Sequence, residues 1–198
     1  EIVNVNMVFS HGGVYTLPET SWRLHEEFHK EGPLNIRGIH LFDTVHYLFG
    51  AVKQVFASLQ NFSKKSLVPD ANACLFTLCN RATVFLTANY CVPSDSLITI
   101  TGTEGCLYMD RGWAAVRRGR DRNREPSKKD LLMESEPSDA VVESLYHFLS
   151  SFEEEKGFET GLQEGINANI LLDACFRSSV LNIPIDLADY PLYQLSVR

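Results

Sequence analysis

The sequence lacks the signals of several large protein classes. It has no apolar run approaching the roughly 18 residues of a membrane span, and no secretory signal peptide is visible. No Gly-x-Gly-x-x-Gly motif follows a strand-like segment anywhere in the 198 residues, so the usual dinucleotide cradle is missing. We therefore expect a cytoplasmic protein that does not contact a membrane and does not bind a nucleotide cofactor by itself.

Cysteine is scarce, and its spacing indicates neither a disulfide framework nor a metal site. The five cysteines are odd in number, include no Cys-x-x-Cys pair and lie mostly in apolar, strand-like segments. They are Cys74, Cys79, Cys91, Cys106 and Cys175. We expect reduced core thiols, as in cytosolic proteins.

The remaining composition is typical of a globular domain, with 44% hydrophobic and 22% charged residues. A chain of 198 residues fits within one domain with a substantial core. The first residue is Glu1 rather than methionine, and a strand-like run follows at once. We expect a piece of a longer protein or a processed product.

The net charge of -7 conceals one basic segment, residues 111–129, with eight basic and two acidic residues. Such a segment can bind nucleic acid. It also contains the helix- and strand-breaking residues Gly119, Asn123 and Pro126, and its single aromatic residue is Trp113. A solvated loop is the favoured interpretation, and we expect no nucleic-acid partner.

Hydrophobic periodicity predicts the secondary structure. Strands are predicted at residues 1–10, 52–60, 71–79, 82–91, 97–103, 106–110 and 112–118. Helices are predicted at residues 34–49, 139–153 and 161–181. Strands that alternate between apolar and polar residues, followed by helices, predict an α+β domain over 1–198: an open, mainly antiparallel sheet with helices packed on one face.

Capping residues mark the starts of the last two helices. Ser138 is expected to cap the helix from 139, and Thr160 with Gln163 to form a capping box before the helix from 161. An apolar stripe runs along the first of them and consists of Val141, Leu145, Phe148 and Phe152.

The helix predicted at 34–49 carries the best candidate for chemistry. Gly32 and Gly50 bracket it, and His40 and Asp43 lie one turn apart on it. Histidine titrates near neutral pH and can act as acid or base, while a neighbouring carboxylate can orient the ring. A purely structural His40–Asp43 pair remains the alternative.

Three other residues are possible substrate contacts: Trp22, Arg23 and Arg37. Arginine binds carboxylate and phosphate groups with two parallel hydrogen bonds. The alternative is a pair of surface arginines beside a packed tryptophan.

A zinc peptidase is a distant third possibility, since His25, Glu26 and His29 satisfy the His-Glu-x-x-His pattern. The flanks are polar, and Gly32-Pro33 interrupts the segment soon afterwards, so we expect a loop and no metal.

Several motifs together resemble the C-terminal domain of the Gfo/Idh/MocA oxidoreductases. Residues 32–50 are similar to that family's glycine-histidine-aspartate helix, and Gly102-Thr103-Glu104-Gly105 to its turn between two strands. Asp70-Ala71 with the two strands that follow, Thr160 through Ser179, and Ile183-Pro184-Ile185 extend the likeness over nearly the whole chain.

The resemblance implies that His40 exchanges a proton with a substrate hydroxyl and that Asp43 is structural. It implies NAD or NADP in the full-length parent, held by an N-terminal Rossmann domain that is absent here together with its catalytic lysine. It also implies a homodimer or higher homo-oligomer through the sheet face and a sugar, polyol or related hydroxy compound as substrate.

One position departs from the family pattern. Many members place an aspartate four residues before the histidine, where this chain has Ile36. Some have asparagine there, and Asn35 is the adjacent residue, about 100° away around an α-helix. The leading hypothesis is the substrate-binding and dimerisation domain of an oxidoreductase, with Asn35 among its substrate contacts. The alternative is a non-catalytic binding or scaffold domain derived from that fold.

Overall fold

The computed structural model describes residues 1–28, 30–110, 113–118, 131–134, 139–154, 156–158 and 160–193. These residues form a nine-stranded open sheet in the order β8-β7-β6-β5-β1-β4-β3-β2-β9. The strands are β1 (Ile2–Ser10), β2 (Val52–Gln60), β3 (Ala71–Leu78), β4 (Thr83–Thr87), β5 (Asp95–Gly102), β6 (Gly105–Asp110), β7 (Trp113–Arg118), β8 (Leu131–Glu134) and β9 (Ile185–Asp186).

Every neighbouring pair in the sheet is antiparallel except β1 and β4, which are parallel. The predicted α+β fold with a mainly antiparallel sheet is therefore confirmed. The parallel pair lies in the middle of the sheet, with Val5 opposite Val84 and Met7 opposite Leu86. Its two strands end at the same edge, and that edge carries the candidate site.

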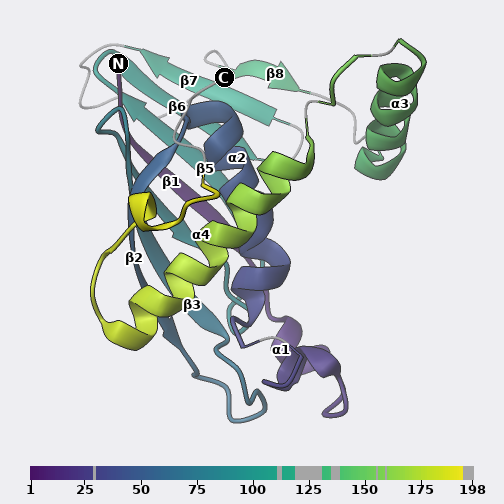
Figure 1. Ribbon diagram of the computed structural model, residues 1–198, viewed down its shortest axis with the longest axis vertical. Coiled ribbons are helices and arrows are strands. Elements are labelled where there is room, and N and C mark those ends of the chain that lie inside the picture. Colours follow the sequence, from purple (N-terminus) through teal and green to yellow (C-terminus); the bar gives the residue numbers. More distant parts are fainter. Residues whose placement is uncertain are drawn as a thin grey trace.

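Two helices, α2 (Ile39–Phe49) and α4 (Leu162–Leu181), cover one face of the sheet (Figure 1). α2 places Phe42 and Val45 against it, and the Phe42 and Phe76 rings lie 5.5 Å apart between centroids. α4 adds Leu171 and Cys175 to the same buried cluster. Alternate residues of β1 to β4 complete this core, as the period of two in their sequence predicts.

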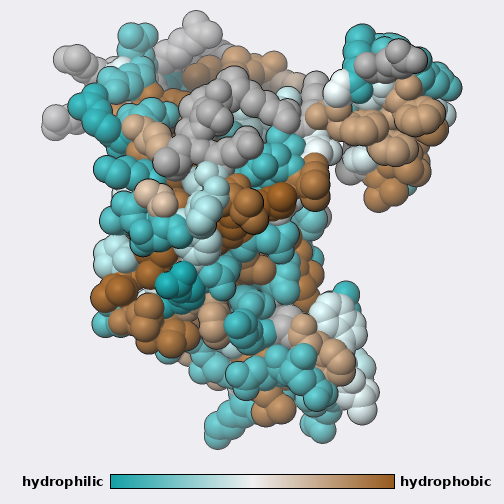
Figure 2. Space-filling model, in the orientation of Figure 1, coloured by the Kyte–Doolittle hydropathy of each residue, from teal (hydrophilic) through white to brown (hydrophobic). Residues whose placement is uncertain are grey.

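α3 (Ala140–Glu153) stands apart from the sheet and does not join the two helices on its face (Figure 1). The predicted stripe is present, but Val141, Leu145, Phe148 and Phe152 are 51–72% exposed. Apolar side chains accordingly gather on the surface of α3 in Figure 2. Phe148 stacks on Phe158, with 5.0 Å between ring centroids.

Both predicted caps are wrong in detail. The N-cap of α3 is Asp139, whose carboxylate accepts hydrogen bonds from the backbone N–H groups of Val141 and Val142, while Ser138 lies outside the described residues. The N-cap of α4 is Gly161 rather than Thr160. Its N–H donates to the Glu164 carboxylate at 2.7 Å. A carboxylate accepts this hydrogen bond better than the Gln163 amide because it is charged.

Other expectations are corrected or left open. β4 ends at Thr87 instead of 91, and β8 was not predicted. Much of the basic segment, at 111–112 and 119–129, lies outside the described residues. All five cysteines are free, but only Cys74 and Cys175 are buried, and Cys79 is exposed. Among the described helices, none has both the length and the apolar character needed to cross a membrane.

Candidate functional site

The candidate site begins where the parallel strands end. His11 directly follows β1, and Tyr90 lies three residues after β4. Because parallel neighbours present their carboxyl ends at one edge, the two side chains meet there, with 4.6 Å between ring centroids. The backbone N–H of His11 donates to the Asn89 carbonyl at 2.8 Å, which fixes the two chain segments side by side.

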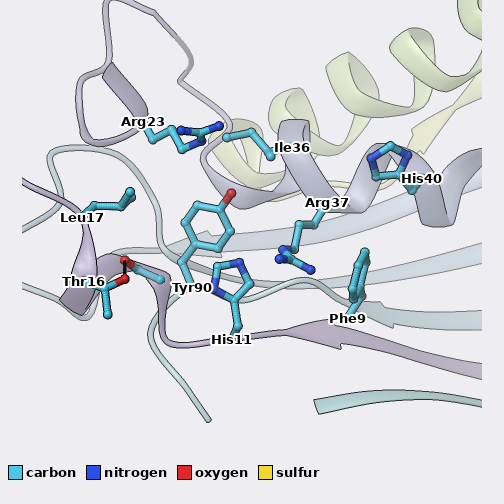
Figure 3. A pocket seen from close by; sticks show the side chains of 10 residues that line it. Phe9, His11, Thr16, Leu17, Arg23, Ile36, Arg37, His40 and Tyr90 are labelled. Carbon is cyan, nitrogen blue, oxygen red and sulfur yellow. Dashed lines mark hydrogen bonds between the residues drawn. The ribbon is translucent and has the colours of Figure 1, made fainter. Parts of the chain in front are cut away.

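A hollow of about 500 Å³ opens beside this pair (Figure 3). The short helix α1 (Gly13–Thr16) and the 3-10 turn Trp22–Leu24 border one side of it. The other side is bordered by the start of the α2 segment, which consists of the turn Leu34–Gly38 and α2 itself. Its lining consists of Phe9, His11, Gly13, Thr16, Leu17, Arg23, Ile36, Arg37, His40 and Tyr90.

The α2 segment enters the site through a widened turn. Residues Leu34–Gly38 form a π-helical turn, and α2 proper begins at Ile39, so the predicted helix exists but its first turn is not α-helical. This turn presents Ile36 and Arg37 to the hollow, and His40 follows on the exposed first turn of α2. The predicted stop is confirmed, since Gly50 ends the helix with φ of 95°.

Each of the two arginines that line the hollow lies over an aromatic ring. The Arg37 guanidinium lies 4.3 Å from the Phe9 ring centroid, and the Arg23 guanidinium lies 4.6 Å from that of Trp22. Burial raises the pKa of the Tyr90 phenol, although the charges and hydrogen bonds of Arg37 and Arg23 oppose this shift. Burial and the nearby Arg37 charge lower the pKa of His11. The hollow is therefore electropositive.

Asp43 lies on the side of α2 that faces α4, outside the hollow. Burial raises the pKa of its carboxyl, the charge of Glu164 on α4 adds to this effect, and His40 opposes it. Among the described hydrogen bonds, none joins Asp43 to His40. The two side chains thus interact through charge, and the ring of His40 is left to face the hollow.

The structure brings together three of the predicted site residues, Arg23, Arg37 and His40, and adds Ile36 to them. Asn35 and Trp22 do not line the hollow, and Trp22 contributes by holding Arg23. The roles assigned to all of these residues stay predictions.

In the His-Glu-x-x-His motif, His25 Nε2 is hydrogen-bonded to the Glu19 carbonyl oxygen at 2.9 Å, while His29 lies outside the described residues. No cluster of three or more potential metal ligands occurs in the part of the chain that the structure describes.

Sequence reasoning missed His11 and Tyr90. The only signal at His11 was the break His11-Gly12-Gly13 after a strand, which is typical of an ordinary turn. Knowing that β1 and β4 are parallel would have placed both residues at one edge. Alternation along a strand does not reveal this, because it shows that one face of the sheet is covered and not which strand lies beside which.

Comparisons with known proteins agree with this architecture. The family described as the GFO/IDH/MocA C-terminal domain matches residues 1–108, more than half of the chain. No curated protein sequence matches significantly.

Solved structures with the same fold include an oxidoreductase from Desulfitobacterium hafniense, at a TM-score of 0.82 and 19% identity, with 96% of this chain and 57% of that chain covered. Levoglucosan dehydrogenase in complex with NADH and levoglucosan has a TM-score of 0.78 and 17% identity, with 94% and 59% covered. An Agrobacterium radiobacter oxidoreductase in complex with NAD+, L-tartaric acid and magnesium has a TM-score of 0.72 and 18% identity, with 96% and 58% covered. The chain thus spans less than three fifths of these proteins, and the likeness shows the shared fold.

Proposed function

The chain belongs to the Gfo/Idh/MocA family through its C-terminal domain, and from this premise we propose that it is the substrate-binding and dimerisation domain of an NAD(P)-dependent oxidoreductase. The observation that carries the proposal is the exposed His40 imidazole at a hollow of about 500 Å³. The substrate is a sugar, a polyol or a related hydroxy compound.

His40 is the proposed acid–base residue. When a secondary alcohol is oxidised, its carbon gives up a hydride and its hydroxyl gives up a proton, which a base must accept. His40 is exposed and has no described hydrogen bond through its ring nitrogens, so it is free to accept that proton. Asp43 stays outside the hollow and acts on α2 as a structural residue.

The nicotinamide nucleotide does not fit this chain alone. The sequence has no Gly-x-Gly-x-x-Gly turn after a strand, and the glycine pair beside the hollow, Gly12-Gly13, lies at the start of a helix of only four residues. In the proposal, another segment of the full-length protein binds the nucleotide and brings it to the hollow. The complexes of levoglucosan dehydrogenase with NADH and of the Agrobacterium radiobacter protein with NAD+ support this arrangement by analogy.

The uncovered face of the sheet supports dimerisation. Phe56, Leu75 and Phe85 lie opposite one another on β2, β3 and β4, and each is at least 36% exposed. An apolar row of this kind is typical of an interface. The free thiols suggest a cytoplasmic location.

The second candidate is a scaffold domain without catalysis. Ile36 favours it, because this apolar side chain lines the hollow at the position where many family members carry an aspartate. A scaffold would keep the sheet interface and have no use for the imidazole of His40.

The test uses the full-length protein that contains this chain. Reduction of NAD+ and NADP+ is measured with a panel of neutral sugars, polyols and sugar acids, for the wild type and for His40→Asn. We expect at least one substrate to be oxidised and His40→Asn to lower kcat by about 10²- to 10⁴-fold, with unchanged circular dichroism and Tm.

His25→Asn is the matched control, since His25 lies outside the hollow and we expect its activity to equal that of the wild type. Failure of the wild type to reduce either nucleotide with any compound would favour the scaffold. Normal turnover by His40→Asn would remove His40 from the reaction.

A further inference from the structure

The charge of the residues that line the hollow indicates the chemical class of the substrate. This inference rests on the proposed function. Two arginines and two histidines are among the lining residues, and no aspartate or glutamate is. The chain as a whole carries a net charge of -7, so this balance is the reverse of its surroundings.

Neither arginine of the hollow, Arg23 or Arg37, has an ion-pair partner in the part of the chain that the structure describes. Instead each guanidinium lies over an aromatic ring, Trp22 for Arg23 and Phe9 for Arg37. A guanidinium that stacks by its face keeps the N–H groups at its edge available for a planar acceptor such as a carboxylate.

Tyr90 is a shared interaction partner of Arg37 and Arg23. Its side chain is only 5% exposed, and both guanidinium groups interact with its hydroxyl. Figure 3 shows this hydroxyl pointing towards the start of the α2 segment, with Arg37 lying between the Tyr90–His11 pair and His40. Arg37 and His40 are three residues apart on the same helical segment, so a ligand held by Arg37 also reaches His40.

The hydrogen-bonding groups of the lining residues also favour an anionic ligand. A neutral polyol needs acceptors for its hydroxyl protons as well as donors for its oxygens. Phe9, Leu17 and Ile36 supply apolar wall, and the Thr16 hydroxyl already donates to the Gly13 carbonyl. Of the polar groups that remain, the two guanidinium groups can only donate, and they match an acceptor-rich anion.

We propose that the substrate carries a carboxylate or phosphate group, bound by Arg37 and Arg23 beside Tyr90, with its reacting hydroxyl directed to His40. Arg37 and Arg23 are then specificity-determining residues. Both oxyanions share the required chemistry, since each presents several charged oxygens to a guanidinium.

The test measures binding to the full-length protein that contains this chain, without added nucleotide, by isothermal titration calorimetry at low ionic strength. D-gluconate, D-glucose 6-phosphate and the neutral D-glucitol are the probes, and they separate carboxylate, phosphate and uncharged ligands on similar carbon skeletons. We expect one of the anions to bind at least tenfold more tightly than D-glucitol, and added salt to weaken that binding.

Arg37→Gln should weaken the anion about 10- to 100-fold, as expected for loss of a charged hydrogen-bonding partner. Arg37→Lys, which keeps the charge but loses the planar fork, should fall between Arg37→Gln and the wild type. Arg81→Gln is the control, because Arg81 lies on the surface with its side chain 88% exposed and should leave binding unchanged. Circular dichroism and Tm check folding, and Arg23→Gln replaces Arg37→Gln if the latter does not fold.

Equal binding of D-glucitol and the anions, wild-type affinity in both Arg37 variants, or no binding of any probe would each overturn the inference. The full-length enzyme separates this result from the proposed function. Oxidation of neutral compounds that depends on His40 but not on Arg37 would refute only the anion requirement. Anion binding that depends on Arg37, without reduction of either nucleotide, would refute only the oxidoreductase function.

Discussion

At the scale of single residues, a buried hydrogen-bonded pair ties the end of the described chain to α2. The Tyr193 hydroxyl lies 2.7 Å from His46 Nε2 and accepts the backbone N–H of Val52 at 2.9 Å. The hydroxyl can donate its own proton to His46 Nε2 when the neutral ring carries its proton on Nδ1. Burial lowers the pKa of His46 to about 4, although the charge of Glu164 opposes the shift.

This pair predicts a loss of stability in mild acid. Unfolded histidine has a pKa near 6.5, so between pH 6.5 and 4 the unfolded chain binds a proton that the folded chain excludes. The free energy of unfolding is then highest above pH 6.5 and falls as the pH drops to 4, by about 2–3 kcal/mol from this residue. Urea denaturation at a series of pH values measures the effect.

The variant His46→Gln isolates this contribution from that of other groups. Its amide oxygen can accept the Tyr193 proton but does not titrate, so the difference in unfolding free energy between wild type and variant should itself change over pH 4–6.5. A constant difference over that range would show that His46 titrates alike in both states.

At the scale of elements, the turn before the α2 segment depends on Gly32. This residue has φ of +60°, and a Cβ added to it would lie 1.9 Å from the Pro69 carbonyl oxygen. Gly32→Ala therefore meets both a disfavoured backbone conformation and a clash with backbone, and should destabilise the protein by at least about 2 kcal/mol. Chemical denaturation measures the change.

Gly165→Ala is a matched control within a helix. Gly165 lies in α4, and an added Cβ there would meet no atom within 4 Å. Alanine should stabilise α4 by about 0.5–1 kcal/mol, because it lowers the entropy cost of helix formation. If Gly32→Ala were as stable as the wild type, the turn would have an alternative path past Pro69.

The sequence predicted elements better than their surroundings. Alternation in β2 and β3 revealed these strands because Val55, Ala57, Cys74 and Phe76 all point to one covered face. The stripe on α3 was equally clear, yet α3 stands apart, since a pattern shows which face is apolar and not what covers it.

Only part of the candidate site could be predicted from the sequence, for a related reason. His40 and Arg37 belong to one continuous motif, and local spacing was enough to single them out. His11 and Tyr90 are 79 residues apart and meet only through the parallel pairing of β1 with β4. The π-helical turn at Leu34–Gly38, which contains Ile36 and Arg37 of the lining, also has no mark in residue spacing.

At the scale of the whole molecule, we propose that the face of the sheet opposite α2 and α4 is the dimer interface. One row crosses it from β2 to β6: Phe56, Leu75, Phe85, Asn6, Thr99 and Tyr108, each directly opposite the next. With strands about 4.8 Å apart, this row is about 25 Å wide, which fits a stable interface of about 800 Å² per partner. Asn4, on the same face of β1, has a buried side-chain oxygen without a described hydrogen-bond partner.

These features predict a dimer that a single charge disrupts. Phe85 lies in the apolar part of the row and is 45% exposed in the single chain, so Phe85→Glu should fold normally and yet place a carboxylate, at high cost, in the interface. Size-exclusion chromatography with light scattering should give twice the chain mass for the wild type and the chain mass for Phe85→Glu. Phe62→Glu is the control, because Phe62 is 74% exposed and lies in the loop after β2, away from the row. A dimer that survives Phe85→Glu would have to form through another surface, and the stripe of α3 would be the next to test because its apolar side chains are 51–72% exposed.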